Sequence, residues 1–137
     1  MGFTEMSIRQ TKDFALIQSL NNTIFPLDDL ELDHKTRAWI VWENKLPVGF
    51  CTLRMIGKRI AYFDRAGLLE RAKGQGIHSK MVAVREQYAR SHQCKSTITY
   101  TMKYNIKSLI TLIRKGWEFY DPEYRYSGDV YYFRKNF

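Results

Sequence analysis

The chain has 137 residues, of which 45% are hydrophobic and 15% aromatic, a composition that predicts one packed domain over residues 1–137 rather than a disordered chain. The formal net charge of +8 suggests a nucleic acid or a phosphorylated cofactor as partner, but the basic residues form no run of five or six, which argues against a nucleic acid. No apolar run approaches the roughly 18 residues of a membrane span, and the two cysteines lack metal-ligand spacing. We therefore expect reduced thiols, a cytoplasmic location and no metal site.

The first third of the chain predicts a strand, a helix and an acidic segment. Alternating residues indicate a strand from Phe3 to Arg9, and Thr11 is a suitable N-cap for the helix that follows. The apolar face of that helix consists of Phe14, Ile17, Leu20 and Ile24. Pro26 ends it. The segment from Leu27 to His34 is either a solvated loop anchored by its leucines or a lid whose carboxylates attract a cationic substrate.

Three strands joined by short turns follow and form an antiparallel meander. They are predicted over residues 37–43, 48–55 and 59–69. Gly49 indicates a bulge or a close backbone contact near the start of the second strand.

A helix, a strand and a second helix come next. Ile77, Met81, Val84 and Tyr88 recur at helical spacing and predict the core-facing stripe of the first helix. Three basic residues are expected outside that stripe: Lys80, Arg85 and Arg90. Residues 96–102 alternate as a strand, and the helical crossover predicts that this strand runs parallel to the strand of residues 59–69.

The C-terminal part predicts a capped helix and two strands. Asn105 is the expected N-cap and Gly116 the expected C′ residue. The expected apolar face of this helix consists of Ile106, Leu109, Ile110 and Ile113. Strands are predicted over residues 117–120 and 130–134, where the aromatic residues 131–133 belong either to the core or to the edge of a homodimer.

The turn that joins the third strand to the long helix has the features of a phosphate site. Gly74 and Gly76 let a ligand approach the backbone, and the helix N-terminus adds about half a positive charge. The run G-x-x-x-x-G-K-[ST] of a P-loop does not occur, and Ser79 stands where a dinucleotide loop needs its third glycine.

The segment from Arg71 to Gly76 reads R-x-x-G-x-G and resembles motif A, the pyrophosphate loop of the GNAT superfamily of N-acetyltransferases. Asn105 and Ser108 read N-x-x-S and resemble motif B of that superfamily. The resemblance covers nearly the whole chain. It implies an α+β (α/β) fold of the GNAT type, with a mixed six- to seven-stranded sheet, an antiparallel meander, a central parallel strand pair and flanking helices.

The resemblance also implies acetyl-CoA as cosubstrate and positions for its contacts. The backbone of Ala66, Gly67 and Leu68 would pair with the pantetheine, and Asn105 and Ser108 would lie beside it. The pyrophosphate would be held by the amides of Lys73, Gly74, Gln75, Gly76, Ile77 and His78. Arg71 and Lys73 add positive charge to that turn.

The implied chemistry is direct attack of a primary amine, from a small molecule or a peptide, on the thioester. Asp64 and Glu70 are candidate bases, and Asp64 could instead form an ion pair with Arg65. The acid is usually a tyrosine seven residues after the motif B asparagine, and Leu112 occupies that position.

Three outcomes remain open for the missing acid. Another tyrosine serves (the candidates are Tyr104, Tyr120 and Tyr126), water protonates the thiolate, or the protein binds CoA without efficient turnover. Substrate contacts are expected from the acidic residues Asp28, Asp29 and Glu31. The alternative function is a non-catalytic CoA-binding or basic nucleic-acid-binding module.

Overall fold

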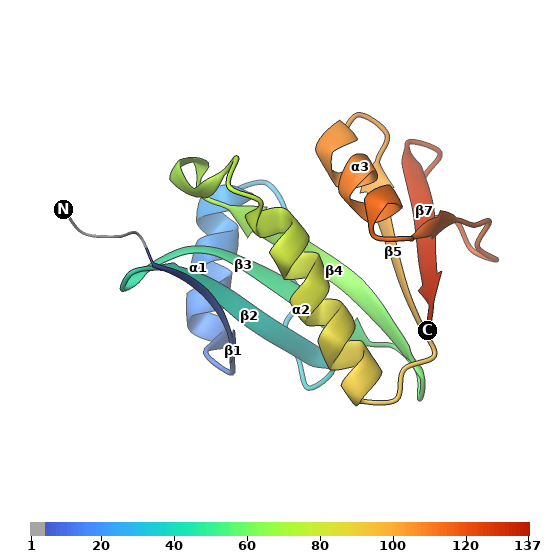
Figure 1. Ribbon diagram of the computed structural model, residues 1–137, viewed down its shortest axis with the longest axis horizontal. Coiled ribbons are helices and arrows are strands. Elements are labelled where there is room, and N and C mark those ends of the chain that lie inside the picture. Colours follow the sequence, from blue (N-terminus) through green and yellow to red (C-terminus); the bar gives the residue numbers. More distant parts are fainter. Residues whose placement is uncertain (1–4) are drawn as a thin grey trace.

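The computed structural model describes residues 5–137 (Figure 1). In chain order the elements are β1 (Met6–Thr11), α1 (Phe14–Ile24), β2 (Thr36–Glu43), β3 (Leu46–Met55), β4 (Ile60–Leu68), the short 3₁₀ helix η1 (Glu70–Ala72), α2 (Ile77–Ser91), β5 (Ser96–Met102), α3 (Ile106–Arg114), β6 (Glu118–Phe119) and β7 (Val130–Asn136). The first strand extends past its predicted end at Arg9, and Phe3, where it was predicted to begin, lies outside the described residues. None of the helices in this part of the chain combines the length and hydropathy needed to cross a bilayer.

The described strands form one seven-stranded sheet in the order β1-β2-β3-β4-β5-β7-β6. Strands β2 to β4 are the expected antiparallel meander, β1 adds to it antiparallel beside β2, and β4 and β5 are the expected parallel pair. That pair is short, because it ends at Tyr62 and Ile98. Beyond those residues the two strands run apart, so the sheet opens into a V (Figure 1). β6 covers the outer edge of β7 at Phe133, and the amide of Tyr120 donates to the carbonyl oxygen of Tyr132 at 3.0 Å, so these two residues do not form a free sheet edge.

Two bulges shape the meander. The expected irregularity at Gly49 is present, because the β2–β3 register shifts next to it. A Cβ on Gly49 would lie 2.5 Å from Cδ2 of Leu68, so glycine permits a close contact between β3 and β4. A second bulge lies in β4, where Asp64 and Arg65 together oppose Thr52 of β3.

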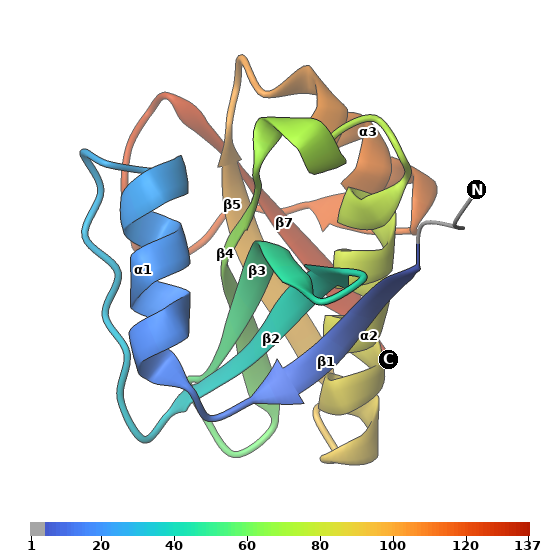
Figure 2. The same cartoon turned by 90° about the vertical axis from the view of Figure 1, so that its left-hand side faces the viewer.

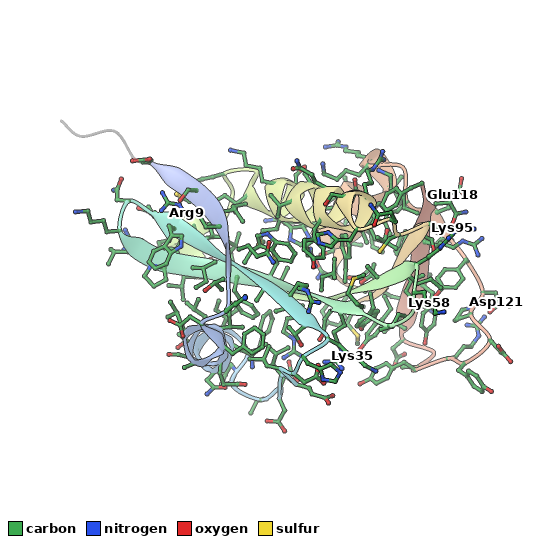
Figure 3. All side chains as sticks on the ribbon, turned by 90° about the horizontal axis from the view of Figure 1, so that it is seen from below. Arg9, Lys35, Lys58, Lys95, Glu118 and Asp121 are labelled. Carbon is green, nitrogen blue, oxygen red and sulfur yellow. The ribbon has the colours of Figure 1, made fainter. Side chains whose placement is uncertain are left out.

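The helices cover both faces of the sheet. α1 packs on one face, and α2 and α3 pack on the other (Figures 2 and 3). The α1-side core contains Ile17, Leu20, Ile40 and Phe50. The N-cap of α1 is Asp13 rather than Thr11: Oδ1 of Asp13 accepts the N–H of Leu16 at 3.1 Å. Thr11 remains the last residue of β1.

The buried face of α2 differs from the expected stripe and includes two charged positions. Ile77 and Met81 are buried as predicted and Val84 and Tyr88 are half-buried, but Arg85, expected at the surface, is only 4% exposed. Glu86 is also buried, because it accepts hydrogen bonds from Nε1 of Trp117 and Nζ of Lys135. These bonds join α2 to the β6–β7 half of the sheet, which the short β4–β5 pairing alone would hold weakly.

The two ends of α3 agree with the prediction, but its buried face does not. Asn105 caps the N-terminus, and Gly116 has a φ of 86° at the C′ position. The predicted apolar stripe is wrong at three of its four positions, because Ile106, Ile110 and Ile113 are 56%, 43% and 51% exposed. Leu109 is buried as predicted, and Leu112 is buried beside it. The helix has apolar residues on two adjoining faces, and only packing against the sheet selects between them.

The acidic segment from Leu27 to His34 is an irregular loop. Leu30 is buried and Leu32 half-buried, whereas Leu27 is 96% exposed and does not anchor the loop. The buried amide of Asn21 donates to the carbonyl oxygen of Asp28 at 2.9 Å. A surface segment is thereby held against the end of α1.

Candidate active site

A cavity of about 240 Å³ lies where β4 and β5 diverge. We call it the central cavity. Its lining comes from both sides of the sheet: Phe25 and Asp28 follow α1, whereas Val82, Arg85 and Leu112 belong to α2 and α3. The gap in the sheet is therefore open to both faces, a geometry that lets two ligands meet from opposite sides.

A second cavity of about 640 Å³ lies on the α2/α3 side, beside the glycine turn. We call it the glycine-turn cavity. Lys73, Lys107 and Arg114 line it, and no acidic residue is among its described lining residues. This distribution of charge suits an anionic ligand.

Four residues line both cavities and mark a neck between them. They are Ala66, His78, Asn105 and Ser108. Nε2 of His78 lies 3.3 Å from Oγ of Ser108. Burial, with a smaller contribution from the Arg85 charge, lowers the pKa of His78 to about 4, so its imidazole is neutral at neutral pH.

The glycine turn presents unpaired backbone amides to the glycine-turn cavity. Gly74 and Gly76 have φ values of 79° and 74°, conformations that favour glycine. α2 begins immediately afterwards, so the N–H groups of its first turn have no partner within the helix. The amide of Lys73, by contrast, already donates to the carbonyl oxygen of Glu70 at 3.2 Å. The available amides therefore begin one residue later than expected.

Two residues of the predicted phosphate motif face elsewhere. The guanidinium of Arg71 forms an ion pair with Glu43 at 2.9 Å and does not line the glycine-turn cavity. The side chain of Gln75 donates to the carbonyl oxygen of Arg71. Lys73 is thus the basic residue of the motif that the structure places at the cavity.

The end of β4 has the free edge that a bound chain would need. Ala66 and Leu68 line the glycine-turn cavity, and their β3 partners lie only on the far side. Gly67 is buried beneath Phe25, and a Cβ there would lie 2.6 Å from Cε2 of that ring. Its role is to let the end of α1 approach the sheet.

Asp64 is the carboxylate that the structure brings into the central cavity. It is half-buried, and burial raises its pKa above the ordinary value. The alternative ion pair with Arg65 does not form, because that guanidinium donates to Oδ1 of Asn21 at 2.9 Å. Glu70 lies elsewhere: its side chain is 90% exposed and pairs with Lys73 at 3.0 Å.

None of the three candidate tyrosines lines the central cavity. Tyr104 is 78% exposed and Tyr126 is 73% exposed, and Tyr120 packs against Arg134. The tyrosine at the cavity is Tyr100 of β5, which sequence reasoning missed. The sequence could have indicated Tyr100 as a site residue, because it lies on the strand predicted to run beside β4. Tyr126 stacks on its ring at 5.0 Å between centroids.

The acidic loop contributes one acidic residue to the cavity lining. Asp28 lines the central cavity, whereas Asp29 and Glu31 are exposed and do not. Arg65 also lines it, but its guanidinium is engaged by the carbonyl oxygens of residues 28 and 29. Within residues 5–137 no cluster of His, Cys, Asp or Glu side chains could hold a metal ion.

Comparisons with known proteins agree with this architecture. A protein-family model described as the acetyltransferase (GNAT) family matches residues 6–120. No curated protein matches the chain at the level of sequence.

Solved structures with the same fold include three acetyltransferases. An IAA acetyltransferase from Bacillus cereus ATCC 14579 is 12% identical with a TM-score of 0.80, covering 97% of this chain and 100% of that chain. A GNAT family acetyltransferase from Elizabethkingia anophelis, solved with acetyl-CoA bound, is 13% identical with a TM-score of 0.79, covering 96% and 98%. Mutant forms of the spermidine/spermine N-acetyltransferase of Vibrio cholerae are 17% identical with a TM-score of 0.74, covering 96% and 93%.

The expected α+β fold of the GNAT type, with its central parallel strand pair, is thereby confirmed. Since the family model matches most of the chain, this protein belongs to the GNAT family of acetyltransferases.

Proposed function

We propose that residues 1–137 form one N-acetyltransferase domain that transfers the acetyl group of acetyl-CoA to the primary amine of a small molecule or peptide. The observation that carries the proposal is the position of Asp64, an unpaired half-buried carboxylate in the gap of the sheet. The glycine-turn cavity reaches the same gap through the neck at His78.

The glycine-turn cavity fits the donor. Its unpaired amides and three cationic side chains match the phosphates of CoA, and the free edge of Ala66 and Leu68 matches an extended pantetheine with its amide groups. Asn105 and Ser108 lie at the neck, where the pantetheine would pass. Bound acetyl-CoA would supply the activated thioester. The acetyltransferase of Elizabethkingia anophelis, which has the same fold, was solved with acetyl-CoA bound.

The acceptor would reach the gap from the α1 side. Asp28, Asp64 and Tyr100 line this part of the cavity, and an ammonium group is attracted by both carboxylates and by an aromatic ring. The spermidine/spermine N-acetyltransferase of Vibrio cholerae provides an example of an amine acceptor on this fold.

Asp64 would act as the general base. Its raised pKa lies closer to neutral than that of an ordinary aspartate, which improves proton acceptance from the attacking amine. The unpaired backbone N–H groups at the end of β4 would polarise the thioester carbonyl.

Thiol release from acetyl-CoA, measured across a panel of polyamines, amino acids, aryl amines and peptides, tests the proposal. We expect release that depends on one amine class, together with mass-spectrometric detection of the acetylated amine. Acetyl-CoA binding without release for any amine would instead support a CoA-binding module, and salt-sensitive DNA or RNA binding without acetyl-CoA affinity would support a nucleic-acid-binding module. A cytoplasmic location and a homodimer remain part of the proposal, to be tested by fractionation and by light scattering.

A further inference from the structure

Arg85 is a buried cation without a carboxylate partner. Only 4% of it is exposed. Its Nε donates to the carbonyl oxygen of Met81 at 3.1 Å and its Nη1 donates to that of Thr52 at 3.3 Å. The guanidinium carbon lies 4.4 Å from the centroid of Phe63. Among the described residues, no ion pair involves Arg85 and no side chain accepts from its Nη2.

The other titratable groups around Arg85 do not neutralise it. Glu86 is paired with Lys135 at 3.1 Å, and burial raises the pKa of the Cys51 thiol to about 11, so it is uncharged at neutral pH. His78 is neutral. Asp64 directly follows Phe63 on β4, so strand alternation places it on the opposite face from the ring that Arg85 contacts, and it forms no ion pair with Arg85 among the described residues. Arg85 therefore contributes a positive charge to the wall of the central cavity.

The position of the Arg85 charge indicates which substrate it would contact. Arg85 belongs to α2, on the side from which the glycine-turn cavity opens into the gap. Leu112 of α3 lines the same side of the central cavity and occupies the place of the usual proton donor. A negative charge that develops on the donor side would lie near the guanidinium of Arg85. Because Leu112 has no acidic proton, α3 would not supply a proton donor there.

We propose that Arg85 is a catalytic residue that stabilises the departing thiolate of CoA by its charge. This role rests on the proposed function. The amine nitrogen forms a bond to the acetyl carbon, the carbon–sulfur bond breaks, and its electron pair leaves on sulfur as a thiolate. The proton of the amine passes to Asp64, and the thiolate is released with its charge held by Arg85. No general acid is needed, which accounts for Leu112.

The decisive measurement is the thiol pKa of CoA bound to the protein, followed by the ultraviolet absorbance of the thiolate as pH rises. A free thiol has a pKa of about 8.5. We expect the thiol pKa of CoA in the wild-type complex to be lower than this by at least about one unit. That difference corresponds to a tenfold larger acid dissociation constant. Arg85→Met should return it toward the value of free CoA, and Arg85→Lys should retain part of the shift. Arg90→Met removes an exposed cation from the same helix and should leave the shift unchanged.

Rescue separates this role from a purely structural one. Arg85→Met also removes the donor to Thr52, so loss of activity alone would not prove catalysis. Introducing Leu112→Tyr into Arg85→Met should restore part of kcat by supplying a proton donor, without restoring the lowered thiol pKa.

A thiol pKa of about 8.5 or higher in the wild-type complex would overturn the proposal even if no Arg85 variant folds. Equal thiol pKa values in wild type and a folded Arg85→Met would also overturn it. Failure to bind CoA at all, seen by calorimetry, would instead refute the assignment of the glycine-turn cavity.

Discussion

Nε2 of His78 lies 3.3 Å from Oγ of Ser108, and this contact joins the first turn of α2 to the first turn of α3. Both residues line the neck between the two cavities. Burial lowers the pKa of His78 to about 4, so the imidazole in this contact is neutral at neutral pH. Acid therefore places a positive charge on a mostly buried ring at the neck.

The free energy of unfolding should fall as pH decreases through the titration range of His78. The pKa of His78 is lowered from 6.5 to about 4, so the unfolded chain binds more protons between those values. The contribution is fully present above pH 6.5 and is lost as pH falls toward 4. From pH 7 to pH 5 the loss is about 2 kcal/mol. Urea unfolding of wild type and His78→Gln at both pH values measures it. His34→Gln changes an exposed histidine and should lose as much stability between the two pH values as wild type does. If His78→Gln also loses as much stability as wild type, the prediction is wrong.

Lys73 and Arg71 should differ in their effect on acetyl-CoA affinity. Lys73 lines the glycine-turn cavity, whereas Arg71 is held by Glu43. A charged hydrogen bond contributes about 1.5–3 kcal/mol, so Lys73→Gln should weaken binding about tenfold or more. Arg71→Gln should change the calorimetric Kd by less than about threefold, because rim charges without a direct contact contribute little. The reverse order of effects would show that the turn binds the phosphates in another way.

Asp64→Asn should lower kcat by about 10²–10⁴-fold, the usual contribution of a general base. Because the base acts when ionised and burial raises its pKa, the wild-type rate should rise with pH through a value above 3.8. That acidic limb should be lost in the variant. Glu70→Gln is the matched control for kcat at saturating acetyl-CoA, since Glu70 lies outside both cavities and contacts only Lys73 of the donor site. A larger effect of Glu70→Gln in steady-state assays would reassign the base.

Asp28→Asn should raise the KM of a cationic acceptor and leave kcat nearly unchanged. The residue lines the central cavity on the α1 side but is exposed, so its attraction is screened by water. An increase of about two- to fivefold corresponds to an interaction of up to about 1 kcal/mol. Asp29→Asn carries the same charge change at a neighbouring exposed position outside the cavity lining. Identical KM values in the two variants would exclude a direct contact from Asp28.

Gly67→Ala should destabilise the fold by about 1–3 kcal/mol, the usual cost of overpacking. The new Cβ would lie 2.6 Å from Cε2 of Phe25, so the end of α1 must move away from β4. Thermal or urea unfolding measures the loss. Gly57→Ala is the control, since its nearest neighbour, Cβ of Ile60, would lie 4.0 Å away. Wild-type stability in Gly67→Ala would mean that Phe25 repacks freely.

Local patterns in the sequence were sufficient for the order and type of the elements. Strand alternation and helical spacing depend on nearest neighbours along the chain, and so do the caps at Asn105 and Gly116. The glycine turn was predictable for the same reason, because it lies within a few consecutive residues. The family resemblance rests on these local segments too.

Packing across the sheet determines which side chains are buried and which line the cavities, and the sequence did not predict all of these. Arg85 follows Met81 by four residues, so it lies on the buried face of α2, although its charge predicts a surface position. Its burial is possible because the carbonyl oxygen of Thr52, beside the β4 bulge, accepts from its guanidinium. Which stripe of α3 faces the core depends on the position of β5 and β7, and the place of Tyr100 at the cavity depends on where β4 and β5 separate.

The fold class and the segment that would hold the donor were predictable from the chain, because both follow from short-range order. The set of charged side chains that converge on the gap between β4 and β5 depends instead on how distant elements pack together. Asp64 and Arg85 come from a strand and a helix that meet only when the sheet is formed, so no spacing along the chain indicates their proximity.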